Sequence, residues 1–269
     1  NYITAAGFDQ SSEKFDRWWP ASYHLIGKDI LTTHAVYWPT MLFSAGISLP
    51  VSIFAHGWWL MGDSKMSKSL GNIINPMDLI DDYGVDPVRY YLMREMVLGH
   101  DSSFTMESFI QRYNSDLAND FGNLLSRVTT LIKKNYDGLI PSPGELSEMD
   151  IAIKNKGEVL PDKINELING MRLNDAVEEI MQFIRTVNKY MEDNAPWKMV
   201  KEDKIAAGKV LYIAGESLRL GAVLLSPIMP NRTGTLLEAL NVKGCDLSWG
   251  GLEPGKSLKD HEPLFPRIK

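Results

Sequence analysis

Cysteine is nearly absent from this sequence, since Cys245 is the single one in 269 residues. One cysteine cannot form a disulfide framework, and it leaves no Cys-x-x-Cys pair to hold a structural zinc ion. The chain also has no apolar run long enough to span a bilayer and no basic segment leading into one. We therefore expect a cytoplasmic protein without a membrane segment. No initiator methionine precedes Asn1, so we expect a cut N-terminus.

An excess of positive charge is missing as well. The chain carries 28 Lys and Arg against 34 Asp and Glu, which gives a net charge of -6. This balance argues against a nonspecific coat on nucleic acid, so any contact with RNA has to be confined to a local patch. With 44% hydrophobic and 23% charged residues, the composition is that of an ordinary soluble protein, and the length favours two domains.

The pattern of apolar residues changes along the chain. Short apolar runs at residues 23–26 and 53–55 flank a helix-like stretch at 30–43, which predicts alternating α/β structure. Glycine, serine and lysine dominate residues 57–71, which predicts a loop. Two short helices are expected to follow it, because Asn75-Pro76 and Asp86-Pro87 each place a cap residue before a proline in a first helical turn.

Beyond Thr105 the periodicity is helical, with Phe109, Tyr113, Leu117 and Phe121 at steps of four. The stripe continues through Leu125, Val128 and Ile132 and predicts one buried helix face. Further helices are predicted at residues 150–169, 173–193, 196–225 and 234–240.

The run from Gly62 to Gly71 places two lysines, Lys65 and Lys68, among small polar residues. A mobile loop of this kind can follow the shifting charge of a polyphosphate, because each lysine is a compact charge on a long stem. An arbitrary pair of lysines would more often be a solvated surface turn. The five residues Lys65-Met-Ser67-Lys68-Ser, however, are identical to the signature loop of the class I aminoacyl-tRNA synthetases.

Residues 19–39 indicate which family within that class the chain resembles. They are more similar to the methionyl-tRNA synthetase family than to the other families of the class. Thr33 departs from the family's pattern, in which many relatives carry an aromatic residue. Spacing alone places His34 and Trp38 on one helix face with Ile30, and core packing would explain that equally well. The resemblance implies that the methionine pocket is lined by Tyr2, Ile30, His34 and Trp38. It implies that ATP is bound by Gly27, Asp29, His56, Gly57, Lys65, Ser67 and Lys68, with Lys65 and Lys68 acting on the leaving pyrophosphate.

A third match lies far from the lysine loop. On the helix predicted from residue 106, Asn119, Asn123 and Arg127 fall opposite the apolar stripe, where a solvated face or RNA contact could explain them. Trp197 stands near the tip of another helix, where it could cap a core or stack on a base. In the methionine family, an Asn, an Arg four residues on and a distant Ala-Pro-Trp grip the anticodon. The resemblance carries that role to Asn123, Arg127 and Trp197.

One string is misleading. Residues 250–257 satisfy the nucleotide-binding P-loop pattern on paper. That motif requires a strand before it and a helix after it. Because a Gly-rich segment precedes this string and Pro263 and Pro266 follow it, we reject a nucleotide site here.

The resemblance therefore implies an α/β plus all-α protein that is predominantly helical. Residues 1–110 would be the C-terminal half of a Rossmann-type class I catalytic domain, and residues 111–269 an anticodon-binding helical bundle. The expected reaction is the ATP-dependent ligation of L-methionine to tRNA(Met) through methionyl-adenylate, with Mg2+ accompanying ATP as substrate and no zinc site in this segment. The family's His-Ile-Gly-His-type motif is absent from residues 1–269, so we expect this part alone to be inactive.

Two alternatives stay open. Another class I synthetase, for leucine, isoleucine or valine, has the same lysine loop. A non-catalytic tRNA-binding module could keep the helical part alone. The family's additional dimerising domain does not appear in residues 1–269, so we expect a monomer.

Overall fold

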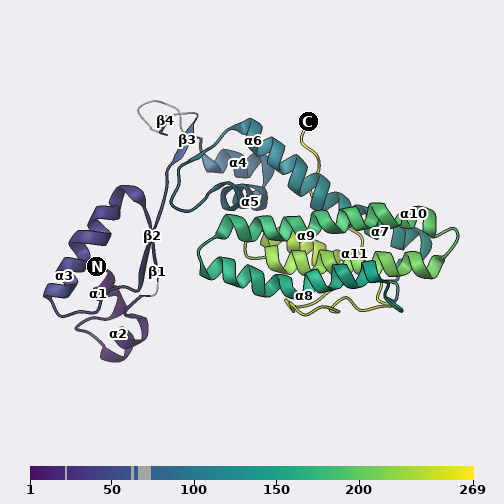
Figure 1. Ribbon diagram of the computed structural model, residues 1–269. Helices are drawn as coiled ribbons and strands as arrows, with labels where there is room; N and C mark the ends of the chain where they lie inside the picture. The colour runs from purple at the N-terminus through teal and green to yellow at the C-terminus, as the bar shows by residue number, and fades with distance from the viewer. Residues whose placement is uncertain (22, 62–63, 66–73) are drawn as a thin grey trace. The chain divides into compact units, whose positions relative to one another are not determined.

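The computed structural model describes residues 1–21, 23–61, 64–65 and 74–269 (Figure 1). They form two compact units. The first consists of Asn1–Ile73 with Met96–Phe104, and the second of Ile74–Glu95 with Thr105–Lys269. The first unit mixes helices and strands and the second is built mainly from helices. The predicted fold class, α/β plus all-α and predominantly helical, is confirmed.

A pair of parallel strands organises the first unit. Strands β1 (Tyr23–Gly27) and β2 (Ser52–His56) pair along their whole length, from Tyr23 opposite Ser52 to Gly27 opposite His56. Parallel strands need a crossover connection. Its helical elements are a 3-10 turn, η1 (Lys28–Ile30), a π-helical turn, η2 (Thr33–Tyr37), and α3 (Trp38–Ser44), while α1 (Tyr2–Ala6) and α2 (Ser12–Trp18) precede the strands.

The helix-like stretch predicted over residues 30–43 is helical throughout, but it is not one regular α-helix. Pro39 lies in the first turn of α3. Because proline has no backbone N–H, the regular ladder of i to i−4 hydrogen bonds cannot pass through it. The chain widens into a π turn before the proline and restarts as an α-helix.

A second, smaller sheet follows β2. Strand β3 (Trp59–Met61) pairs antiparallel with β4 (Ser64–Lys65) and parallel with β5 (Ser102–Ser103). The loop predicted over residues 57–71 is thus wrong where β3 and β4 lie. The run from Trp58 to Met61 is aromatic and apolar, which is the composition of a strand.

The second unit is a helical bundle. Its helices are α4 (Pro76–Tyr83), α5 (Val85–Glu95), α6 (Met106–Arg112), η4 (Tyr113–Gly122, π-helical), α7 (Asn123–Asn135), α8 (Glu148–Asn169), α9 (Leu173–Asn194), α10 (Pro196–Met199), α11 (Lys204–Leu225) and α12 (Pro230–Ala239).

The helix predicted over residues 196–225 is interrupted. It consists of α10 and α11, because Asp203 starts a new helix by accepting a hydrogen bond from the backbone N–H of Ala206. An acceptor at this position satisfies one of the free amides of a first turn and fixes the helix start.

The predicted capping role of Asp86 is also wrong. Helix α5 begins at Val85, and Asp86 is buried inside its first turn. Its carboxylate instead accepts hydrogen bonds from the backbone N–H of Arg232 at 2.6 Å and from Nδ2 of Asn231 at 3.2 Å. Asp86 therefore caps the N-terminus of α12, which lies about 145 residues away in sequence, and no local pattern could have shown this.

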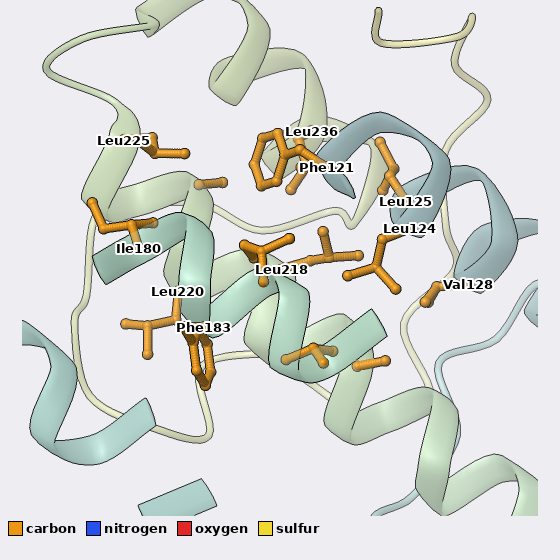
Figure 2. Close-up of a cluster of buried hydrophobic side chains, with 14 of the residues drawn as sticks. Phe121, Leu124, Leu125, Val128, Ile180, Phe183, Leu218, Leu220, Leu225 and Leu236 are labelled. Atoms are coloured by element: carbon orange, nitrogen blue, oxygen red, sulfur yellow. The ribbon is translucent and has the colours of Figure 1, made fainter. Parts of the chain in front are cut away.

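The core of the second unit lies between α7, α9 and α11. The predicted stripe is confirmed, because all seven of its side chains from Phe109 to Ile132 are buried. Helices α9 and α11 approach closely at Gly221, where a Cβ atom would lie 2.9 Å from Cδ1 of Ile184. Figure 2 shows part of this core, with the labelled side chains of Phe121, Leu124, Leu125, Val128, Ile180, Phe183, Leu218, Leu220, Leu225 and Leu236.

The segment with the P-loop pattern is held against α11 by the carboxylate of Glu216, which also forms a buried ion pair. Glu216 is 0% exposed and its carboxylate is 2.7 Å from the Arg219 guanidinium. The same carboxylate accepts hydrogen bonds from the backbone N–H groups of Gly250, Gly251 and Leu252. These amides, which would have to point at a phosphate, are satisfied by Glu216, and this agrees with the rejection of a nucleotide site here.

The last residues of the chain complete the core. Leu264 and Phe265 are buried, and the ring of Phe265 packs edge-on against Tyr113 at 6.0 Å. Asn114 hydrogen-bonds through its side-chain amide to both the backbone N–H and the carbonyl of Ile268 at 2.9 Å. Among the helices described, none combines the length and the apolar character needed to cross a membrane.

Candidate functional site

Three of the four residues expected to line a methionine pocket form an aromatic cluster in the first unit. Tyr2 comes from α1, His34 from η2 and Trp38 from the start of α3. The Tyr2 ring lies 5.2 Å from that of Trp38 and 5.8 Å from that of His34, and the His34 and Trp38 rings are 6.0 Å apart. The structure thus brings Tyr2 together with two residues that lie more than 30 positions away in sequence.

The hydrogen bonds of His34 indicate which tautomer the neutral ring adopts. Its Nδ1 lies 3.0 Å from the carbonyl oxygen of Ile30, which can only accept. Nδ1 must therefore carry the proton, and Nε2 accepts from the Tyr2 hydroxyl at 3.0 Å. Ile30, the fourth predicted residue, joins the cluster through this carbonyl, and its side chain is exposed.

Two residues that the sequence did not single out extend the cluster. The His24 ring on β1 lies 5.0 Å from Trp38 and 5.2 Å from Tyr2, and Trp19 lies 5.7 Å from Trp38. Burial, together with the nearby His34, lowers the pKa of His24. The available signal was alternation along β1, because His24 shares a strand face with the buried Ile26.

Gly27, His56 and Asp29 lie at the carboxyl ends of the two parallel strands. Gly27 ends β1 opposite His56, which ends β2. A Cβ atom on Gly27 would lie 2.5 Å from Oδ1 of Asp29, so glycine lets this carboxylate approach the strand end. Asp29 is exposed and can accept hydrogen bonds from hydroxyl groups. In open parallel sheets, this edge is where ligands bind.

Gly57 is also required by close packing. A Cβ atom there would lie 2.0 Å from the carbonyl oxygen of His100, so any other residue would force the two backbones apart. The carbonyl of Gly57 accepts a hydrogen bond from Nδ1 of His56 at 2.8 Å. Gly57 therefore fixes both the His56 ring and the start of the segment that leads to the lysine loop.

The lysine loop itself is described only in part. The backbone of Lys65 pairs with Leu60 in the small sheet. Ser67 and Lys68 lie outside the described residues. The phosphate-binding role assigned to these three residues stays a prediction from the sequence.

The residues expected to bind an anticodon lie in the second unit. The guanidinium of Arg127 is 5.1 Å from the centre of the Trp197 ring, and its Nη1 is 3.9 Å from Oε1 of Glu192. Trp197 is 36% exposed, which leaves ring surface available to a ligand. Asn123 is exposed one turn before Arg127 on α7. The exposure expected for Asn123 is confirmed.

An open pocket of about 390 Å³ adjoins this pair. Arg127 and Trp197 line it together with Ser126, Thr130 and Leu131. Arginine stacked on an aromatic ring, beside hydroxyl groups and an apolar floor, suits a flat unpaired base better than a metal ion or a phosphate alone. Helix periodicity could have suggested Thr130, which lies on the exposed side of α7, but nothing local placed it beside Trp197.

Comparison with protein families divides the chain in two. Residues 1–129 match the family described as tRNA synthetases class I (M). Residues 140–269 match the anticodon binding domain of methionyl tRNA ligase. Together the two matches account for nearly the whole chain.

Individual relatives match the chain over its whole length. The chain is 42% identical over 276 residues to the methionine–tRNA ligase of Caldanaerobacter subterraneus subsp. tengcongensis and 41% identical over 274 residues to that of Thermotoga maritima. These alignments cover 100% of this chain but 43% and 44% of the relatives, so the chain spans less than half the length of these curated relatives.

Solved structures show the same relationship. The Mycobacterium tuberculosis methionyl-tRNA synthetase bound by methionyl-adenylate superimposes with a TM-score of 0.92 at 40% identity, covering 99% of this chain and 54% of that one. The ligand-free form of the enzyme gives a TM-score of 0.90 at 37% identity. With an aromatic cluster beside β1, an exposed Trp197 and Arg127 pair, and family matches over both parts, this chain belongs to the methionyl-tRNA synthetase family of class I aminoacyl-tRNA synthetases.

Proposed function

We propose that the protein containing this chain is a methionine–tRNA ligase, which activates L-methionine with ATP and transfers it to tRNA(Met). The observation that carries the proposal is the cluster of Tyr2, His34 and Trp38, which packs against β1 through the ring of His24. An aromatic and imidazole wall suits a polarizable thioether. A structural relative at a TM-score of 0.92 is bound by methionyl-adenylate, which supports the same ligand for this fold.

The reaction has two steps. In the first, the methionine carboxylate attacks the α-phosphorus of ATP, the bond to the β-phosphate oxygen breaks, and pyrophosphate leaves. In the second, a ribose hydroxyl at the tRNA 3' end attacks the methionyl carbonyl, AMP leaves and the hydroxyl proton is lost. ATP enters as its Mg2+ complex, so the metal belongs to the substrate.

Different residues bind different parts of ATP in the first step. Asp29 accepts hydrogen bonds from the ATP ribose, while Gly27, His56 and Gly57 shape the nucleotide side of the site. Lys65, Ser67 and Lys68 bind the phosphates. Charge on the leaving pyrophosphate grows as the bond breaks, so lysines placed there stabilise the transition state more than the ground state.

The second unit serves recognition. Trp197 and Arg127 stack on and pair with an anticodon base in the adjoining pocket, and Asn123 contacts a base edge from the next turn of α7. Residues 1–110 then belong to the catalytic domain and residues 111–269 to the anticodon-binding domain. A cytoplasmic location and a monomeric state complete the proposal and rest on the sequence.

Pyrophosphate exchange tests the catalytic proposal. The full-length protein should exchange labelled pyrophosphate into ATP when methionine is present, and should show only background exchange with leucine, isoleucine or valine. The 269 residues alone should give no exchange, because they span less than half of the related ligases. Exchange driven by leucine, isoleucine or valine in place of methionine would overturn the substrate assignment, and no exchange with any amino acid would favour a tRNA-binding module.

Replacing Trp197 by alanine tests the recognition proposal. Loss of one stacked base should weaken binding of tRNA(Met) by about 1–3 kcal/mol, or roughly 5- to 150-fold in Kd at fixed salt. Methionine activation without tRNA should not change. The control is Lys154→Ala, which removes a cation from α8 that is paired with Glu158. Equal losses in the two variants would show that charge, and not stacking, holds the RNA.

A further inference from the structure

We propose that Lys28 and Asp101 are positioning residues, which together hold the strand that carries Lys65 in place for the reaction. This inference rests on the proposed function, because it assigns a purpose to Lys65. Neither residue was singled out by the sequence. Both lie in the first unit, and Lys28 directly follows Gly27, the last residue of β1.

Lys28 would be expected to face a phosphate, since it stands between two residues of the nucleotide side. In the structure, the Lys28 side chain instead contacts Asp101 and Trp58. Its Nζ lies 2.5 and 2.7 Å from the two carboxylate oxygens of Asp101 and 3.9 Å from the centre of the Trp58 ring. A cation with two carboxylate oxygens and an aromatic face around it is neutralised locally. Lys28 is thus engaged in the framework and not directed at ATP.

Asp101 joins this cation to the backbone before β3. Its Oδ1 accepts a hydrogen bond from the backbone N–H of Trp58 at 2.8 Å. The hydrogen bonds from Lys28 and Trp58 lower the pKa of Asp101, so its carboxylate is ionised at neutral pH. One side chain therefore holds the end of β1, through Lys28, against the residue that precedes β3.

The small sheet extends this contact towards the lysine loop. The N–H of Ser102 donates to the carbonyl of Trp58 at 2.9 Å, and β5 then pairs with β3, where Leu60 lies opposite Ser103. On the other side of β3, the same Leu60 lies opposite Lys65. Five contacts thus connect Lys28 to the backbone of Lys65, and each one is a hydrogen bond, an ion pair or a strand pairing.

The close approach at Gly57 leaves this framework little freedom. With the Gly57 backbone seated against His100, one residue before Asp101, the segment cannot slide without opening the contact. Loss of the carboxylate would release one anchor of β3, and a displacement of about 1 Å in a catalytic group can cost roughly a hundredfold in rate.

The test is pyrophosphate exchange by the full-length protein with Asp101→Asn, which keeps the size of the side chain and removes its charge. The expected result is a loss of about tenfold to a hundredfold in kcat, with KM for methionine and the melting temperature unchanged. Lys28→Gln should give the same loss, and Lys28→Arg should keep most of the activity. Asp260→Asn, which breaks the exposed Lys133–Asp260 pair in the second unit, is the matched control and should have no effect.

A double-mutant cycle with Lys65→Ala separates positioning from a general structural defect. If Asp101 acts through Lys65, Asp101→Asn should cost less than about twofold once Lys65 is alanine. An equal loss in both backgrounds, or an unchanged kcat for Asp101→Asn alone, would overturn the inference. If instead Lys65→Ala itself retained full exchange, the proposed role of the lysine loop would fail, and that result is distinct from a failure at Asp101.

Discussion

Replacing Lys68 by alanine in the full-length protein is expected to lower methionine-dependent pyrophosphate exchange by about a hundredfold or more, the usual cost of losing one preorganised donor from a transition state. Lys68 lies outside the described residues, so this expectation rests on the signature string and on the family membership of the chain. Steady-state exchange at saturating methionine and ATP measures it directly.

The tRNA affinity of the same variant provides the control. In the proposed function Lys68 acts only on the pyrophosphate, so Lys68→Ala should bind tRNA(Met) as tightly as the unchanged protein, whereas Trp197→Ala should show the reverse pattern. If Lys68→Ala kept its exchange rate, the lysine loop would not be acting on the pyrophosphate, and a tRNA-binding module would become the better explanation.

The second large effect concerns stability. Glu216→Ala should lower the free energy of opening α11 by about 3–5 kcal/mol, because it leaves the Arg219 cation buried without its counter-charge. Arg219 is 1% exposed, and the three backbone N–H groups of residues 250–252 would lose their acceptor as well. Hydrogen exchange of α11 amides in the full-length protein, read by mass spectrometry, should accelerate by roughly two to four orders of magnitude.

Glu253→Ala is the matched control for this prediction. Glu253 also pairs with a cation, Lys256, at 2.7 Å, but its side chain is 65% exposed. An exposed pair of this kind contributes at most about 1 kcal/mol. Similar exchange rates in the two variants would show that the buried pair contributes no more than a surface one.

Local signals in the sequence predicted local structure well. Asn75 caps α4 through Met77, as the Asn-Pro pair indicated. The apolar stripe, which runs from α6 through the π-helical η4 to α7, predicted the buried face and the exposed position of Asn123. Neither result depends on distant parts of the chain.

Contacts between distant segments account for what was missed. Asp86 had the local appearance of a cap for its own helix, yet its acceptor role is taken up by α12. The sequence around His24 indicates only a strand, whereas in the structure its ring packs against those of Tyr2 and Trp38. Lys28 and Asp101 lie 73 positions apart, so no spacing rule could join them.

The resemblance to a family predicted a grouping of residues that their spacing in the sequence could not. Spacing alone left core packing open for His34 and Trp38, and the structure shows them in contact with Tyr2 from a separate helix.

The position of the last residues has a consequence for synthesis on the ribosome. Leu264 and Phe265 fill the core between helices that are made much earlier, and Ile268 supplies the backbone groups that satisfy Asn114. Chains generally fold one domain at a time as they emerge. The helices of the second unit therefore emerge with a gap in their core, and the unit can reach its final packing only after residue 268 has left the exit tunnel.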